Sequence, residues 1–265
     1  MLSTRTLARV GALLLCLGLV SPVGSTYANH LASPGPIHAG NTFGWYPALW
    51  RDEFVGPLRP VWHKSGRGDL RTKNGMLTLT GASTGTVSAT LGMSGHATGR
   101  WEVRMKARRW STAYANPTVR TELIPAGTRP QYCGARNIAL ESYRMGHPRA
   151  QFFINNLPNL AYRSSKPLRF GGDRWHTLAV EVTPSHISWF VDAHVISTER
   201  RPDAISGVPF TVRISVNGVA ASRNNRTRVQ LDWLRYWTLA KANRKSIAAP
   251  SPVKGTNPTA CPPTA

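Results

Sequence analysis

The sequence predicts an all-β fold, a two-sheet antiparallel β-sandwich. Apolar and polar residues alternate in several segments, and clusters of Gly, Pro, Asn and Asp separate these segments. The 265 residues include 23 Gly and 20 Pro, which disfavours long helices because both residues interrupt them. A hydrophobic fraction of 41% with nine Trp supplies enough apolar surface for a core, so a disordered chain is excluded.

Five segments alternate with the period of two that places successive side chains on opposite faces of a sheet. In chain order they are 76–80, 100–106, 176–182, 187–191 and 229–237. The dipeptide at 192–193 separates two of them, and this spacing predicts a tight hairpin turn. No internal repeat and no βαβ alternation is present, so we expect one domain, at residues 48–240.

Residues 1–28 have the pattern of an export signal. Two arginines precede an apolar run at 10–20 that is too short to cross a bilayer of about 30 Å. Small residues follow, so cleavage after Ser25 or after Ala28 fits the pattern, and an uncleaved anchor is the alternative. We therefore expect a secreted or cell-envelope protein with a linker at 29–47 and no transmembrane segment in the mature chain.

The composition changes again at residues 241–265, which are rich in Pro, Ser, Thr and Lys and predict a flexible or extended tail. Cys133 and Cys261 are the cysteines beyond the signal segment, and an oxidising compartment would favour a disulfide between them. Such a bond would stabilise the fold by about 4–5 kcal/mol in the chain-entropy model, and two free thiols are the alternative. The histidines show no metal-ligand spacing, so neither a metal nor a cofactor is expected.

Several motifs occur in a characteristic order. They are RDEF at 51–54, NGML at 74–77, GRWEVR at 99–104, WH at 175–176, ISWFVD at 187–192 and VQLDWLRY at 229–236. In this order the motifs resemble glycoside hydrolase family 16, the laminarinase and lichenase group, over nearly the whole predicted domain. The resemblance implies a concanavalin A-like β-jelly roll whose concave sheet forms a sugar-binding cleft.

The family's catalytic residues lie on one strand, as Glu-x-Asp-x-Glu or as a bulged Glu-x-Asp-x-x-Glu. The first Glu is the nucleophile, the Asp assists it, and the last Glu is the acid/base. Alternate side chains of a strand share a face, so all three acids point into the cleft. A retaining mechanism requires the two working carboxyls about 5–5.5 Å apart.

The matching segment of this chain, residues 133–141, keeps only the last acid. The unbulged register places Asn137, Ala139 and Glu141 at the three positions, and the bulged register places Arg136, Ile138 and Glu141 there. None of the replacements can form a glycosyl ester. The resemblance therefore implies a glycoside hydrolase fold in which the standard retaining mechanism is not supported.

Glu122 is the candidate for a replacement carboxylate, because the family places a strand bordering the cleft in this region. If its strand adjoins the strand of Glu141, the two carboxyls could lie about 5 Å apart, or at the 6.5–9.5 Å that suits an inverting pair. Alternatively, Glu122 pairs with Arg120 or another arginine, and Glu141 is held by Arg136 or Arg144 without a catalytic role.

Five further side chains are candidates for contacting a sugar near this strand. They are Asn137, Tyr143, Trp110, Tyr114 and His147. Aromatic rings can stack on sugar rings, although aromatic residues of a sandwich more often belong to its core.

The chain is strongly basic, with 33 Lys+Arg against 12 Asp+Glu and a formal net charge of +21. Such a charge attracts anionic surfaces, and the attraction weakens as salt rises. Outside the cell these surfaces include wall polymers, phospholipid headgroups and acidic polysaccharides. The export signal argues against nucleic acid as a partner, and a simple contribution to solubility is the alternative.

Three functions follow from the sequence. The first is a polysaccharide hydrolase with Glu141 and Glu122 as an altered acid pair. The second is an inactive relative that binds polysaccharide or cell-wall glycan through the same cleft, and the third is a basic cell-envelope protein that binds anionic wall polymers without a sugar site. Loss of the nucleophile favours the second function, and we expect a monomer.

Overall fold

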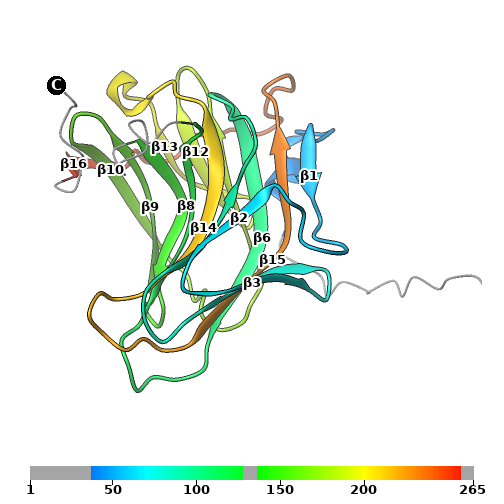
Figure 1. Ribbon diagram of the computed structural model, residues 1–265. Coiled ribbons are helices and arrows are strands. Elements are labelled where there is room, and N and C mark those ends of the chain that lie inside the picture. Colours follow the sequence, from blue (N-terminus) through cyan, green and yellow to red (C-terminus); the bar gives the residue numbers. More distant parts are fainter. Residues whose placement is uncertain (1–36, 128–135, 258–265) are drawn as a thin grey trace, which may run out of the picture. The chain divides into compact units, whose positions relative to one another are not determined.

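The structure is a computed structural model that describes residues 37–127 and 136–257. All of these residues belong to one compact unit, residues 35–265. Its strands form two eight-stranded sheets that lie face to face with the hydrophobic core between them (Figure 1). Every pairing between the named strands is antiparallel, which confirms the predicted two-sheet antiparallel β-sandwich.

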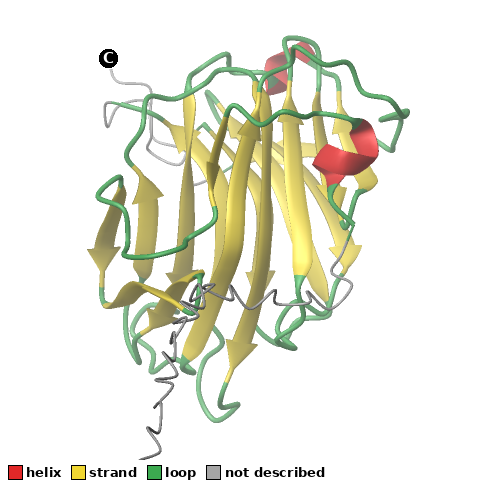
Figure 2. Ribbon diagram, turned by 90° about the vertical axis from the view of Figure 1, so that its right-hand side faces the viewer, coloured by secondary structure: helices red, strands yellow, loops and turns green. Residues whose placement is uncertain are grey.

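The order of the strands in each sheet differs from their order in the chain (Figures 1 and 2). Sheet A runs β13 (His194–Glu199), β12 (Ile187–Val191), β11 (His176–Val182), β6 (Gly99–Arg109), β15 (Thr227–Trp237), β4 (Met76–Gly81) and β3 (Gly68–Lys73), and β1 (Trp50–Asp52) pairs with β15. Sheet B runs β16 (Val253–Thr256), β10 (Leu160–Pro167), β9 (Arg149–Asn156), β8 (Asn137–Arg144), β7 (Thr118–Pro125), β14 (Phe210–Asn217), β5 (Val87–Leu91) and β2 (Trp62–Gly66). The helical elements of the described residues include α1 (Ala39–Phe43) and the 3-10 turn η2 (Pro202–Ala204).

The alternation seen in the sequence determines which side chains face the core. In β6, Val103 and Met105 are buried between the sheets. The charged residues that alternate with them point to the outer face of sheet A, and they are Glu102, Arg104 and Lys106. The five predicted segments correspond to β4, β6, β11, β12 and β15. Asp192 and Ala193 have φ angles of 49° and 61°, so they form the predicted hairpin turn with both residues left-handed.

A hydrogen bond from Trp189 crosses the core from sheet A to sheet B. Trp189 of β12 is fully buried, and its indole Nε1 donates to the carbonyl oxygen of Ala139 in β8 at 2.9 Å. This bond joins the middle of β8, the strand that carries the predicted catalytic segment, to the opposite sheet. It satisfies two polar groups that would otherwise be buried without a partner.

The segment before the sandwich packs on the outer face of sheet A. Ala39, Phe43 and Trp45 form a small second core with Phe190 and Trp237. The backbone N–H groups of Ala39 and Gly40 donate to the carboxylate of Glu102, which is fully buried, at 2.6 and 3.1 Å. The first turn of α1 is therefore attached to β6 by an acidic side chain.

The described part of the C-terminal segment lies along the sandwich. Arg100 donates to the carbonyl oxygen of Lys241 at 2.8 Å, and Asn243 bonds to Glu181 and Trp45. Strand β16 then pairs with the edge strand β10 of sheet B. Among residues 37–127 and 136–257, no helix has the length and apolarity that crossing a membrane would require.

Replacing Trp189 with Phe tests the bond across the core. The substitution keeps an aromatic ring but leaves the Ala139 carbonyl buried without its donor, so we expect a loss of about 1–3 kcal/mol in the free energy of unfolding. Urea denaturation followed by circular dichroism measures this loss. A change below about 0.5 kcal/mol, the ordinary range for surface substitutions, would contradict the structural role given to this bond.

Candidate functional site

Strands β7 and β8 pair in sheet B, so the condition considered for Glu122, that its strand adjoins the strand of Glu141, is met. Thr121 lies opposite Glu141, and the next residue, Glu122, lies opposite Ala139. Two adjacent residues of β7 therefore face residues of β8 that are two positions apart, which means that β8 contains a β-bulge. The pairing of β8 with β9 shifts at the same place, between Ala139 and Ser142.

The bulge turns Glu141 into the interior of the sandwich. The Thr121 hydroxyl lies 3.3 Å from Oε1 of Glu141 and 3.2 Å from the sulfur of Met105, which belongs to the opposite sheet. Glu141 is fully buried, and its recorded partner is Thr121 rather than Arg136 or Arg144. The expectation that Glu141 faces a cleft as an acid/base is therefore not met.

The side chains of β8 that point to the outer face of sheet B are those of Asn137, Ala139 and Ser142. Asn137 donates to Glu122 at 2.5 Å, and Arg120 donates to the Ser142 hydroxyl at 3.4 Å. Ala139 lies between the core residues 138 and 140, so its methyl group points outward. These three positions have the spacing of the bulged motif Glu-x-Asp-x-x-Glu.

Both registers considered from the sequence are corrected by this arrangement. Each of them assigned the third outward position to Glu141, whereas Ser142 occupies it in the structure. The physical reason is that the bulge lies inside the segment, at residues 140–141, so that two consecutive side chains face the core. None of the three outward positions carries a carboxyl group.

Glu122 is buried on the outer face of sheet B and is held by the partly exposed cation of Arg213. Nη2 and Nε of Arg213 donate to its Oε1 at 2.6 and 3.0 Å, and Asn137 donates to its Oε2. Asn155 in turn donates to the Asn137 oxygen at 2.8 Å. The alternative that Glu122 forms an ion pair is confirmed, with Arg213 rather than Arg120. Because Glu141 points the opposite way, the two acids cannot act on one substrate from a shared face.

The environment of Glu141 favours its neutral form. Burial raises the pKa of Glu141 to about 8, and the nearby Glu122 charge acts in the same direction. The Thr121 hydrogen bond and the charge of Arg120 oppose this rise without cancelling it. Its second carboxyl oxygen has no hydrogen-bond partner among the described residues. A neutral carboxyl is the form that the interior of the sandwich accommodates.

Basic residues outnumber acids across sheet B. Its eight strands contain two acidic residues, Glu122 and Glu141, and only Glu122 reaches the outer face. The guanidinium groups of Arg120 and Arg163 lie 5.3 and 5.4 Å from the ring centroid of Phe153 on the same face. The outer face around Glu122 is therefore positively charged and has a ring stacked between guanidinium groups.

A hollow of about 410 Å³ adjoins this group of side chains. Its lining includes Thr90 and Thr211, and Ile124, which is two positions along β7 from Glu122. Thr90 is the cross-strand partner of Arg213, so one residue of the lining lies next to the ion pair. The volume falls in the range of small-ligand sites.

The remaining predicted contact residues lie elsewhere. Tyr143 faces the core, where its ring contacts Phe170. His147 is exposed in the turn after β8. Trp110 and Tyr114 are exposed in the β6–β7 loop, where they contact arginines of the β14–β15 loop and of β15 rather than Glu122. Of the five predicted contact residues, Asn137 is thus the one that lies beside Glu122. Cys133 and Cys261, the residues of the predicted disulfide, lie outside the described residues.

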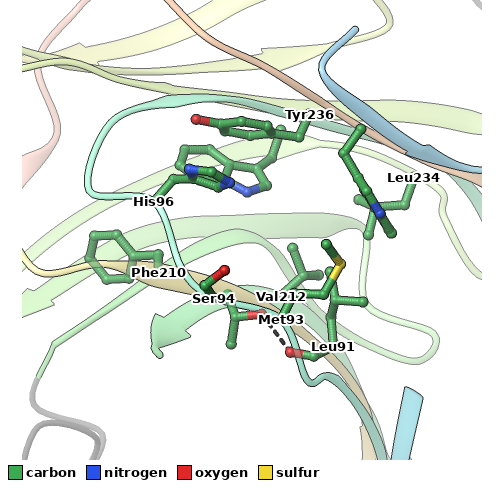
Figure 3. A pocket seen from close by; sticks show the side chains of 11 residues that line it. Leu91, Met93, Ser94, His96, Phe210, Val212, Leu234 and Tyr236 are labelled. Carbon is green, nitrogen blue, oxygen red and sulfur yellow. Dashed lines mark hydrogen bonds between the residues drawn. The ribbon is translucent and has the colours of Figure 1, made fainter. Parts of the chain in front are cut away.

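A second opening lies between the sheets and is shown in Figure 3. The rings of His96 and Tyr236 stack there with their centroids 4.1 Å apart. Met93 and Leu234 also line the opening. The space is about 30 Å³, which suits a water molecule rather than a sugar ring. In the described part of the chain, no group of three or more His, Cys, Asp or Glu side chains is placed to hold a metal ion.

Comparison with known proteins identifies the fold. No family model matches the sequence, and no curated protein matches it. Solved structures do match, among them a mutant of SCLam, a non-specific endo-β-1,3(4)-glucanase from family GH16 co-crystallised with 1,3-β-D-cellotriosyl-glucose. That match has 12% identity and a TM-score of 0.59, and it covers 77% of this chain and 97% of the other. The fold is that of the GH16 glucanases.

Two further enzymes give the same result. The laminarinase from Rhodothermus marinus matches with 14% identity and a TM-score of 0.58, covering 72% of this chain and 96% of that one. The endo-β-1,3-glucanase from Pyrococcus furiosus matches with 12% identity and a TM-score of 0.59, covering 72% and 94%. The GH16-like jelly roll expected from the motif order is confirmed at the level of the fold.

Two residues of the group around Glu122 and Asn137 were missed from the sequence. Ser142 lies at the spacing of the bulged motif from Asn137, so a register placed one residue later would have found it. Arg213 is 91 residues from Glu122, and nothing local to either residue indicates that β14 and β7 are neighbours. A search for arginines in later alternating segments would have given several candidates of equal weight.

The raised pKa of Glu141 makes a prediction about pH. A carboxyl whose pKa rises from about 4.5 to about 8 on folding takes stability away as pH increases through that interval. Glu141→Gln mimics the neutral form, so the variant should match the wild type near pH 5 and exceed it by a few kcal/mol near pH 8.5, since each pKa unit is worth about 1.4 kcal/mol. Urea unfolding across this range measures the difference.

Asp69→Asn is the control for this experiment, because Asp69 is half exposed and pairs with Arg71 at the surface. It should leave the pH profile of stability unchanged. Parallel profiles for Glu141→Gln and the wild type would show that Glu141 is ionised in the folded protein.

The Arg213–Glu122 ion pair makes a second prediction. Arg213→Met removes the guanidinium from a fully buried carboxylate, and we expect a loss of about 3–5 kcal/mol in the free energy of unfolding. Adding Glu122→Gln removes the unpaired charge and should recover most of this loss. Arg71→Met, which breaks an exposed pair with Asp69, should cost about 0–1 kcal/mol. Failure of the double variant to recover would show that the arginine stabilises the fold through other contacts.

Proposed function

We propose that this chain is a non-hydrolytic polysaccharide-binding protein, with a GH16-like fold and a binding site on the outer face of sheet B. The observation that carries the proposal is the set of outward residues on β8, Asn137, Ala139 and Ser142, at the spacing of the family's three acids. Without a carboxyl at these positions a glycosyl-enzyme ester cannot form there.

An inverting mechanism also lacks support in this geometry. It requires two carboxyls on one face, about 6.5–9.5 Å apart, with one of them free to activate water. Glu122 already accepts hydrogen bonds on both oxygens from Arg213 and Asn137, and Glu141 is on the interior side of the sheet. Ionising Glu141 in the interior, or separating the Glu122 ion pair, would carry a large desolvation cost.

The outer face of sheet B can bind a sugar without hydrolysing it. The hollow near Arg213 offers the Thr90 hydroxyl and the Ile124 side chain. The Thr211 hydroxyl, by contrast, already donates to the Leu91 carbonyl. A polar group next to an apolar surface is the usual composition of a small-ligand site. The similar SCLam glucanase was co-crystallised with 1,3-β-D-cellotriosyl-glucose, so a β-1,3- or mixed-linked glucan is the first ligand to test. The proposal places the chain outside the cell or in its envelope as a monomer, in line with the export-signal pattern at residues 1–28.

The test combines turnover and binding on the purified chain. Laminarin, mixed-linked glucan and galactan are each incubated with the wild type, Thr90→Phe and Thr80→Phe, and reducing ends and retention on the polymer are measured together. We expect no reducing ends with any protein. Thr90→Phe fills the hollow and should weaken retention roughly tenfold, the effect of losing about 1.4 kcal/mol of contact.

Thr80→Phe is the matched control, because Thr80 lies in sheet A, on β4, outside the hollow. It should bind as the wild type does. Turnover that disappears in Glu122→Gln would overturn the proposal and establish a hydrolase with an unusual acid. Retention that is equal in Thr90→Phe and Thr80→Phe, or absent in the wild type, would exclude the hollow as a polysaccharide site.

A further inference from the structure

The outer face of sheet A carries a second group of cations and aromatic rings, on the opposite side of the sandwich from Glu122. We call it the basic face. It consists of Arg104, Lys106 and Arg108 of β6, Arg228 of β15, Trp175 just before β11 and Trp110 just after β6. The three β6 residues alternate with Val103, Met105 and Ala107, which are buried in the core. Their side chains therefore project from one side of one strand.

The aromatic rings hold these cations in place. Arg104 and Lys106 each lie 4.8 Å from the ring centroid of Trp175. Arg228 and the exposed Arg226 lie 5.4 and 5.3 Å from the ring of Trp110. Stacking on a ring restricts a long basic side chain before any ligand arrives, which lowers the entropy cost of binding.

The acids near the basic face are too few to neutralise it. Asp173 lies 3.3 to 3.9 Å from three of the cations, Lys106, Arg108 and Arg228. Asp232 pairs with Arg104 at 2.6 Å. One carboxylate shared by three cations leaves a positive excess, and Arg108 remains 51% exposed despite this contact.

The spacing and chemistry of the basic face indicate its ligand. Alternate residues of a strand lie about 7 Å apart, so β6 presents an evenly spaced row of positive charges. Guanidinium groups bind carboxylates in a bidentate manner, which suits a polymer that carries a carboxylate on each repeating unit. Among the described residues, the members of the basic face lie on strands or in loops rather than on a helix that could enter a DNA groove. Each of its two Trp rings is already stacked with two cations, so neither ring is left for bases.

We propose that the basic face binds an acidic polysaccharide. This site lies on the other sheet from the proposed glucan site and does not depend on it. A chain with both sites would hold a neutral and an anionic polymer at once, through opposite faces of one sandwich. The acidic polymer binds through charge, so its affinity decreases as salt rises, whereas neutral glucan binding changes little.

The experiment measures retention of the full chain on polygalacturonate, which carries one carboxylate per unit, at about 50 and 200 mM salt. The test variant is Arg108→Gln/Arg226→Gln, which removes two exposed cations from the face and its border. The control variant is Arg67→Gln/Arg200→Gln, which removes two exposed cations elsewhere and changes the net charge equally. We expect the test variant to bind roughly tenfold more weakly, with a smaller salt dependence, and the control to bind as the wild type does.

Two further measurements decide between explanations. Trp175→Leu keeps every charge but removes the ring under Arg104 and Lys106, and it should weaken binding several-fold if the rings position the cations. Equal weakening in the test and control variants would overturn the proposal in favour of net charge alone. Tighter binding of a single-stranded DNA oligonucleotide, lost in the same test variant, would assign the face to nucleic acid instead. Thr90→Phe should retain polygalacturonate, so failure of the glucan site and failure of the basic face are distinguishable.

Discussion

The β-bulge in β8 determines the chemistry that the outer face of sheet B can offer. It directs residues 140 and 141 to the core together, and from that point every following side chain of the strand changes face. Trp189 fixes the strand just before the bulge by bonding to the Ala139 carbonyl across the sandwich. An acid that a regular strand would expose is therefore buried beside Thr121, and Ser142 takes its place outside.

The scarcity of acids governs the rest of the electrostatics. With 12 acids against 33 Lys+Arg, the chain commits several of its carboxylates to structural bonds. Glu122 is held by Arg213, and Glu181 receives Arg100, His186 and Asn243. Glu102 binds the first turn of α1. Burial raises the pKa of Glu102 to about 7. Few carboxylates remain to neutralise the outer faces of the two sheets, so both faces are basic.

The two outer faces nevertheless differ in a way that bears on function. On sheet B Glu122 is paired with Arg213 on a face that also carries Arg120 and Arg163, and a hollow lined by threonine and apolar side chains lies near this ion pair. On sheet A the cations project in a row from β6 and are stacked on Trp175 and Trp110, and the acids paired with them in the described part of the chain are Asp173 and Asp232. The first arrangement suits a neutral sugar chain, and the second suits a polyanion. The sandwich thus has a hollow of ligand size near three outward positions of β8 that carry no carboxyl group.

The sequence by itself determined the all-β class, the strands β4, β6, β11, β12 and β15, the hairpin at 192–193 and the family to which the fold is similar. These features are local, because a period of two and a short turn are written in consecutive residues. The family resemblance placed Glu122 on a strand bordering the cleft, but it did not determine whether this strand adjoins that of Glu141. Only the tertiary structure decided which way these acids point and what holds them. The direction of Glu141 depends on a bulge defined by pairing with β7 and β9, and the state of Glu122 depends on Arg213 from a strand 91 residues away. Neither pairing leaves a local signal, since register between strands is set by side-chain packing across the whole sheet.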